Sequence, residues 1–259
     1  MKQQLLIILF ILVRLTTFGQ TAEDLNDQSK KLLQAGEIEK AVPLLKQAAE
    51  KGSAEAQYNL GYCYQSGIVV EKDNIKAVEW YLKSADQGFN DGLYQMMMVY
   101  GNGDGVERNA EKAFSYALQC AENSDETCMW NVIQCYYQGM GVKKDVDKMF
   151  VWATRLGKLE NPENLAKSGY ITSTRLQLAY MYRDGKDIPQ DYFNSYLWFL
   201  IYNEFKVDFS VSVQEGIIEE IKELETKLTK EQKVNGEKEA ESLLGRPLKN
   251  IKNLYKADI

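Results

Sequence analysis

Histidine is absent from this chain of 259 residues, so the commonest general base and metal ligand is missing. Without histidine, neither a Ser/His nor a Cys/His nucleophile pair can form. The sequence also has no phosphate-binding P-loop, no GxSxG nucleophile turn and no dinucleotide fingerprint. Carboxylates and four cysteines remain as groups that could do chemistry. We therefore predict no catalytic residue, no cofactor and no metal site.

One series of polar residues has the composition of a general acid/base set. Its members are Asp73, Asn109, Asp145 and Asp191. Paired carboxylates can exchange protons with a substrate. These four residues, however, recur at separations of 36, 36 and 46 residues, and each one precedes a stretch with helical apolar spacing. Because Asp and Asn side chains accept hydrogen bonds from the free N–H groups at a helix start, we predict helix N-caps instead.

The same separations relate many other positions, which means that the chain contains a repeat. Each of four copies has a Tyr three residues before a Gly and an apolar residue three residues after it, followed by an aromatic residue. In the first copy, residues 54–88, these landmarks are Tyr64, Gly67, Val70 and Trp80. A shorter copy precedes it. Self-similarity at a fixed period of this length is typical of stacked helical repeats.

Each copy contains two amphipathic helices that flank a loop beginning with glycine. In the first copy, Ala56, Leu60 and Cys63 lie on one face of the first helix. Gly67 ends that helix because glycine adopts the left-handed conformation at little cost. One helix pair cannot bury its apolar surface alone, so neighbouring pairs must stack. We predict an all-α fold, a right-handed α-solenoid of stacked antiparallel helix pairs with a C-terminal helical cap.

These residues resemble the Sel-one-like repeats, a family related to the tetratricopeptide repeats. The family pattern contains an Ala, an LG pair, a Tyr, a GxGV loop, an Asp, a KA pair, an aromatic residue and a closing Gly. The first copy supplies Ala56, Leu60, Gly61, Tyr64, Gly67, Val70, Asp73, Lys76, Ala77, Trp80, Ala85 and Gly88. The resemblance covers residues 22–244 and is weaker towards the end, where Asn194 and Ser195 replace the KA pair. It implies an interaction module that binds a protein or peptide partner on its concave face.

The repeat and the flanking patterns divide the chain into four parts. We predict a targeting segment at 1–19, a repeat solenoid at 20–208, capping helices at 209–246 and a tail at 247–259. The predicted repeat units lie near 22–52, 54–88, 90–124, 126–158 and 173–208.

Two segments depart from the repeat. Residues 159–170 are an insertion, which we expect to form an irregular surface loop, with an extra helical turn as an alternative for part of it. Two capping helices are expected to begin near Val213 and Lys230, because capping-box spacings precede them. These spacings join Ser212 to Glu215 and Thr229 to Gln232.

Residues 1–19 have the pattern of a signal peptide. Lys2 precedes an apolar run over residues 5–13, and the small residues Thr17 and Gly19 precede the expected cut. Nine apolar residues are too few for a membrane span, which needs about 20. We therefore expect an exported bacterial protein, periplasmic or secreted, with no membrane span after cleavage. The formal net charge of −6, without a long basic run, argues against nucleic acid as a partner.

The four cysteines form two pairs by their register. Cys63 and Cys135 share one repeat position on the predicted core face, and we expect small buried side chains there. Cys120 and Cys128 occupy positions that hold small residues in the earlier copies, which suggests close approach of two helix ends. In an exported protein the pair can form a disulfide or stay reduced. The resemblance favours the bond, because a cysteine-rich secreted branch of the family bridges cysteines eight residues apart at this junction.

A partner-binding surface is predicted from side chains that turn away from the core. With positions 56, 60, 63 and 64 facing inward, positions 57, 58, 61, 62 and 65 and their counterparts are expected to face outward. Aromatic residues and Arg are enriched at protein interfaces. The predicted partner-binding residues are Tyr62, Gln65, Met98, Gln134, Tyr137, Arg175, Tyr180 and Arg183. The column at position 58, with Tyr58, Tyr94 and Trp130, is expected to pack helix against helix instead.

Three functions are compatible with these features. The favoured one is a non-enzymatic interaction or scaffold module that binds a protein or peptide partner on the concave face. The alternative, implied by the resemblance to the cysteine-rich branch, is a protein that binds or hydrolyses cell-wall fragments or β-lactams. The lack of a nucleophile with a base beside it argues against hydrolysis. The third is a structural spacer between other components.

Overall fold

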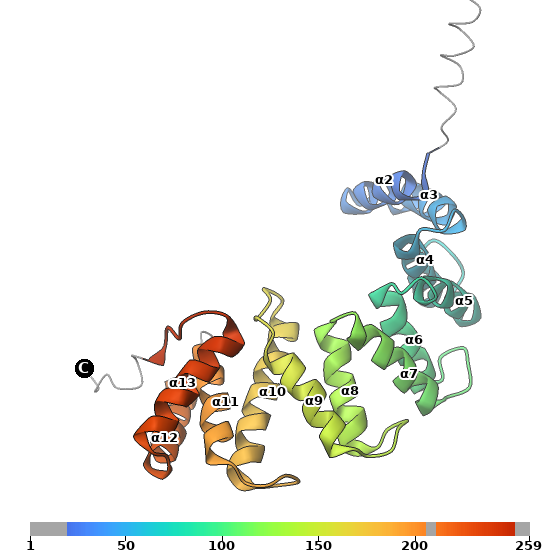
Figure 1. The fold of residues 1–259 in the computed structure, drawn as a ribbon. Coiled ribbons are helices and arrows are strands. Elements are labelled where there is room, and N and C mark those ends of the chain that lie inside the picture. The colour runs from blue at the N-terminus through green and yellow to red at the C-terminus, as the bar shows by residue number, and fades with distance from the viewer. Residues whose placement is uncertain (1–19, 206–210, 252–259) are drawn as a thin grey trace, which may run out of the picture. The chain divides into compact units, whose positions relative to one another are not determined.

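The computed structural model describes residues 20–205 and 211–251, and Figure 1 shows its helices. Twelve helices and no strand are present in these residues. They belong to two compact units, Met1–Asn123 and Ser124–Ile259, which are described separately below. The prediction of an all-α fold built from stacked helix pairs is confirmed. The predicted targeting segment, residues 1–19, lies outside the described residues.

The first unit contains three helix pairs that pack in chain order (Figure 1). The pairs are α2 (Ala22–Gln34) with α3 (Ile38–Glu50), α4 (Ala54–Ser66) with α5 (Asn74–Ala85), and α6 (Asn90–Asn102) with α7 (Ala110–Glu122). We call the first helix of each pair the A helix and the second the B helix. Every helix contacts the next one, and the A helices α4 and α6 also contact each other. Pro43 lies within α3 without interrupting it.

The second unit contains two further pairs and two final helices. The pairs are α8 (Glu126–Gln138) with α9 (Val146–Gly157), and α10 (Leu165–Asp184) with α11 (Tyr192–Glu204). The A helices α8 and α10 contact each other, as α4 and α6 do in the first unit. The final helices, α12 (Val211–Lys227) and α13 (Lys230–Leu244), both pack against α11. They therefore cover the last B helix of the repeat.

Four A helices end on a glycine in the left-handed conformation, as predicted for the first of them. The φ angles are 71° at Gly67, 87° at Gly103, 78° at Gly139 and 66° at Gly185. Each glycine N–H donates to the carbonyl four residues earlier, which satisfies an otherwise free acceptor at the helix end. The chain then turns into the loop that leads to the B helix.

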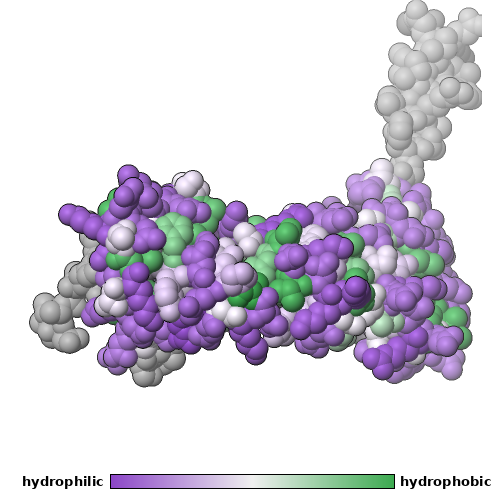
Figure 2. All heavy atoms as spheres, turned by 60° about the horizontal axis from the view of Figure 1, so that its bottom comes forward, coloured by the Kyte–Doolittle hydropathy of each residue, from purple (hydrophilic) through white to green (hydrophobic). Residues whose placement is uncertain are grey.

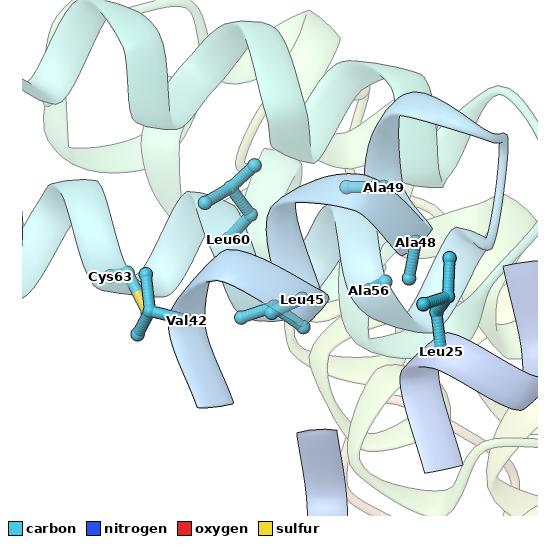
Figure 3. Close-up of a cluster of buried hydrophobic side chains, with 8 residues drawn as sticks. All are labelled: Leu25, Val42, Leu45, Ala48, Ala49, Ala56, Leu60 and Cys63. Carbon is cyan, nitrogen blue, oxygen red and sulfur yellow. The ribbon is translucent and has the colours of Figure 1, made fainter. Parts of the chain in front are cut away.

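The core of the first unit is shared between neighbouring helices. Figure 3 shows Leu25 of α2, Leu45 and Ala48 of α3, and Leu60 of α4, all of which are buried. The small side chains between the large ones let the helices approach closely, as expected of a close-packed interior. No single helix pair supplies this cluster, so the stability of each pair depends on its neighbour.

Two positions of the A helices that were expected to face outward are buried, so that expectation is wrong. In α4 these residues are Gln57 and Gly61. A Cβ atom added to Gly61 would lie 2.7 Å from the Tyr81 ring of α5. The reason is that an A helix packs against its own B helix, the preceding B helix and the adjacent A helix, so its buried stripe is wide. Their counterparts are buried as well: Leu93, Met129 and Arg175, and Met97, Ile133 and Ala179.

The insertion differs from the expected irregular loop because its second half is helical. Helix α6 begins at Asn90, and the repeat separations of 36 and then 46 residues place the equivalent start of α10 at Thr172. Helix α10 in fact begins at Leu165. Helix α10 therefore extends seven residues further than the register requires. The Asn164 side chain caps the extension by accepting from the N–H groups of Ala166 at 3.0 Å and Lys167 at 3.1 Å.

Of the two predicted capping boxes, one is confirmed and the other is wrong. The Thr229 hydroxyl accepts from the N–H of Gln232 at 3.2 Å, and the Gln232 side chain accepts from the N–H of Thr229 at 2.9 Å. Helix α12 begins at Val211, so Ser212 lies inside the helix and is not its N-cap.

Candidate interaction surface

The residues that resembled an acid/base set are helix caps, as predicted. Asp73, Asn109, Asp145 and Asp191 precede α5, α7, α9 and α11, with φ between −147° and −150°. Each side chain accepts from a backbone N–H two or three residues later, at 2.9 to 3.1 Å. These side chains are therefore occupied by local hydrogen bonds, each at the start of a different helix.

A lysine in the first turn of the B helices α5, α7 and α9 lies over a Tyr of the preceding A helix. Lys76 Nζ lies 3.0 Å from the Asp73 carboxylate and 5.6 Å from the centre of the Tyr64 ring. Hydrogen bonds from the backbone and side chain of Lys76 lower the pKa of Asp73. Lys112 lies over Tyr100 and Lys148 over Tyr136 in the same way, at 4.9 and 5.6 Å. The Lys of the KA pattern and the Tyr of the A helix therefore contact each other within the fold. This contact accounts for the recurrence of both residues without a role in a binding site.

The cysteines are divided as the register indicated. Cys120, near the end of α7, and Cys128, in the first turn of α8, are disulfide-bonded, so the predicted bond is present. Cys63 is buried and Cys135 is half-buried, and both are free thiols. Burial raises the pKa of both thiols, which keeps them protonated and unreactive at neutral pH.

Two of the predicted partner-binding residues stand exposed on adjacent A helices of the first unit. Tyr62 of α4 is 48% exposed and Met98 of α6 is 37% exposed. They occupy the same repeat position, and their helices contact each other. Gln65 is half-buried instead, and its side chain accepts a hydrogen bond from the Tyr81 hydroxyl at 2.8 Å. Its counterpart in α6 is Gly101, which has no side chain to cover the surface beside Met98.

The residues at position 58 hold neighbouring elements together, in agreement with their expected packing role. The Tyr58 ring lies 6.0 Å from the ring of Phe89, which caps α6. Trp130 of α8 stacks on Tyr170 of the α10 extension at 5.6 Å. These large aromatic groups are contacts within the fold and are only partly available to a partner.

The predicted residues of the second unit are half-buried and largely engaged. Arg183 forms ion pairs with Asp184 and Glu220, and its guanidinium lies 4.5 Å from the Tyr180 ring. Tyr180 also packs edge to face against Phe199 at 5.2 Å. Of the remaining two residues, Tyr137 lies under Lys144 Nζ at 5.1 Å, and Gln134 accepts from the Gln138 side chain at 3.2 Å. This surface is less free to rearrange around a partner than the one at Tyr62 and Met98.

The prediction that Arg175 contacts a partner is wrong, because its side chain is fully buried. The guanidinium donates to the carbonyls of Gly157 and Leu159 and to Asn161 Oδ1, at 2.6 Å for the last. It also stacks on the Phe205 ring at 3.9 Å. Burial lowers the pKa of Arg175 to about 9. Its role is to anchor the first half of the insertion to α10.

A groove that the sequence did not predict lies beside this arginine, within the second unit. Phe205, after α11, lies between Arg175 and Arg246, whose guanidinium is 5.2 Å from the ring. Glu204 is buried and accepts from Arg246 and from the N–H groups of Lys249 and Asn250. A cavity of 460 Å³ opens here between the insertion and residues 246–250, and a second one of 280 Å³ lies between the insertion, α10 and Phe205. The exposed start of α10, Leu165, lines both cavities, and no sequence pattern marks it.

The exposed surface of the protein carries both apolar and hydrophilic side chains. Figure 2 shows apolar side chains in separate patches among hydrophilic ones on the face that it displays. Among the described residues, no helix has the length and apolar character that crossing a membrane requires.

These features define a class of protein: a helical repeat protein whose polar landmarks serve as helix caps. A family model for the Sel1 repeat matches residues 36–53, 54–89, 91–125, 129–158 and 175–201. The chain belongs to the Sel1 repeat family. Proteins of this family generally act as scaffolds for protein interactions and are typically non-enzymatic.

One of the similar solved structures has the same fold. A Sel1 repeat protein from Oxalobacter formigenes is 24% identical, with 89% of this chain and 92% of that chain covered and a TM-score of 0.61. A protective antigen of uropathogenic Escherichia coli strains, which displays an SLR fold, is 23% identical, with 92% and 57% covered and a TM-score of 0.40. A search of curated proteins gave no match.

Proposed function

We propose that this protein is a non-enzymatic interaction module that binds a protein or peptide partner on the A-helix face, the concave side in helical solenoids. The observation that carries the proposal is the exposed pair of Tyr62 and Met98 on the adjacent helices α4 and α6. Tyr combines a large apolar ring with a polar tip, and Met adapts its shape to different partners. Such side chains are typical anchors of protein interfaces.

The helices that present this pair support the proposal through their charge. Helices α4 and α6 contain no Lys or Arg, and their only charged side chains are Glu55 and Asp91. The carboxylate of Glu55 is already bonded to Asn26 and Lys30 of α2. A partner that covers Tyr62 and Met98 therefore desolvates few unpaired charges, which keeps the cost of binding low.

Site-specific photo-crosslinking in the native cell tests the binding face. Replacement of Tyr62 by p-benzoylphenylalanine preserves an aromatic side chain at the proposed contact. The same group at Glu79, which is exposed on the B helix α5, serves as the matched control. A discrete crosslinked partner at position 62 that is absent at position 79 supports the proposal. Equal products at both positions, or products at position 79 alone, refute it.

We also propose that the protein is exported and periplasmic or secreted. The pattern of residues 1–19 supports this, and so does the disulfide between Cys120 and Cys128, because disulfides persist in oxidising compartments. Fractionation of the native cells followed by mass analysis tests the proposal. A protein that starts at Gln20 in the envelope or medium fraction is the expected result, and a full-length chain confined to the cytosol contradicts it.

The alternative of a β-lactam or cell-wall-fragment protein has no observation in its favour among the described residues. A turnover assay with a chromogenic β-lactam and with peptidoglycan fragments separates it from the interaction module. Hydrolysis that persists in purified protein would replace our proposal.

A further inference from the structure

Val69 has a backbone conformation that a valine adopts only under strain. Its φ angle is 60°, in the left-handed region, where a β-branched side chain is an outlier. The side chain is nevertheless 52% exposed, so burial does not explain the strain. Strained residues of this kind persist where the surrounding structure imposes them, and they cluster at functional sites.

The register shows that the fold does not require a valine here. The same loop position holds Gly105, Gly141 and Asp187, with φ angles of 77°, 67° and 65°. Glycine takes this conformation freely, and Asp takes it at low cost. Val69 is thus the one β-branched residue at this position of the four equivalent loops.

The two loops of the first unit show what the valine changes. A Cβ atom on Gly105 would lie 2.8 Å from the carbonyl oxygen of Asn74, so this loop closes against the start of α5. The register counterpart of Asn74 in the preceding pair is Ile38, the first residue of α3. At that junction Val69 stands where the next loop has Gly105. An open notch of 470 Å³ remains, lined by Ile38, Ile68 and Val69 and by residues 36, 37, 39 and 40.

The charged groups at the rim are mainly acidic. Glu37 and Lys40 form an ion pair, which leaves the Glu39 carboxylate without an ion pair to a described residue. Residues 20–123 contain 16 acidic and 10 basic side chains, a formal charge of −6. A basic segment is therefore attracted to this part of the molecule, and an acidic one is repelled.

We propose that this notch is a second docking site, which takes an aliphatic side chain flanked by Lys or Arg from a partner protein. Val69 and Ile38 contact the aliphatic group, and Glu39 pairs with a neighbouring basic residue. The site lies in the loop after α4 and at the start of α3, so it is separate from Tyr62 and Met98. The strained backbone of Val69 lowers the stability of the protein, and the valine side chain keeps the notch open and apolar.

Titration of the isotope-labelled protein with short synthetic peptides, followed by nuclear magnetic resonance, tests the proposal. The probe is GSKLKSG, and the controls are GSKSKSG and GSELESG. The first should shift the amide resonances of Ile38 and Val69 with a measurable Kd, and both controls should bind at least fivefold more weakly. Equal shifts with all three peptides, or shifts elsewhere on the protein, would overturn the site.

Variants then separate a docking role from a structural one. Val69→Asn relieves the strain, because Asn tolerates this conformation, so the Tm should stay equal or rise while the peptide Kd increases at least fivefold. Ile75→Asn, at an exposed apolar residue outside the notch, is the matched control and should leave the Kd unchanged. A marked fall in Tm for Val69→Asn, or an unchanged Kd, would refute the proposal. Tyr62→Ala should not affect this peptide, so the two binding proposals can fail independently.

Discussion

Replacement of Gly61 by alanine should destabilise the protein, although alanine is the better helix former. The new Cβ would lie 2.7 and 2.8 Å from two ring carbons of Tyr81 and 3.1 Å from the Ala77 carbonyl oxygen. The ring cannot easily move, because Tyr81 is fully buried and its hydroxyl bonds to Gln65. Overpacking of this kind costs about 2–3 kcal/mol, whereas helix propensity returns about 1 kcal/mol. The net loss is about 1–2 kcal/mol.

Thermal denaturation of the oxidised full-length protein measures this difference, and a loss of that size lowers Tm by about 2–8 °C in a chain of this length. Gly101→Ala is the matched control, because no atom lies within 4 Å of its added Cβ and the residue is also in an A helix. This variant should raise Tm slightly. A rise in Tm for Gly61→Ala would refute the reasoning, since helix propensity would then outweigh the contact with Tyr81.

Three further predictions concern the bonds that hold particular segments. Replacing both Cys120 and Cys128 by alanine should lower the free energy of unfolding by about 2.5 kcal/mol, the chain-entropy value for so short a loop, and a urea titration checks it. Arg175→Ala should cost about 2–4 kcal/mol, because three acceptors of the insertion lose a charged donor; faster hydrogen exchange in residues 157–161 is the specific readout, and an unchanged Tm would contradict the anchoring role. The lowered pKa of Asp73 means that its hydrogen bonds stabilise the fold above the unfolded-state pKa of about 3.9 and are lost as the pH falls through the folded pKa. Asp73→Asn keeps the cap, as Asn109 does in the next loop, and should flatten the dependence of Tm on pH below about pH 4; an unchanged slope would show that this carboxylate does not contribute.

The caps were predictable from the sequence because the repeat compares each residue with its own counterparts, whereas the disulfide was favoured by the resemblance to the cysteine-rich branch. Asp73 alone could be a catalytic carboxylate or a helix cap. Four Asp or Asn residues at the same repeat position, each before a B helix, indicate the capping role. The same comparison placed Cys120 and Cys128 at a junction of small residues. The repeat therefore supplied the kind of evidence that a single copy lacks.

The burial of Arg175 was missed although the register contained the evidence. Its counterparts are Leu93 and Met129, and both are buried. Helical periodicity in one copy assigned a single inward face, whereas the A helices α4, α6 and α10 are each covered by three neighbours. The insertion could not be predicted in the same way, because it has no counterpart in the other copies. Its helical half depends on Asn164 as a cap and on the contacts of Lys167 with Asp125 and Glu126.

The length of the α10 extension has a consequence for how this chain can vary. Seven residues make almost two complete turns, so the added segment keeps nearly the same rotational phase as the rest of the helix, with a drift of about 20°. Lys167 consequently points to α8 from the same side as the residues that pack there. A deletion of one residue would turn it by about 100° and separate it from both acidic partners. Viable length changes at this point are therefore restricted to nearly whole turns, which limits the tolerated insertions and deletions to a few discrete sizes.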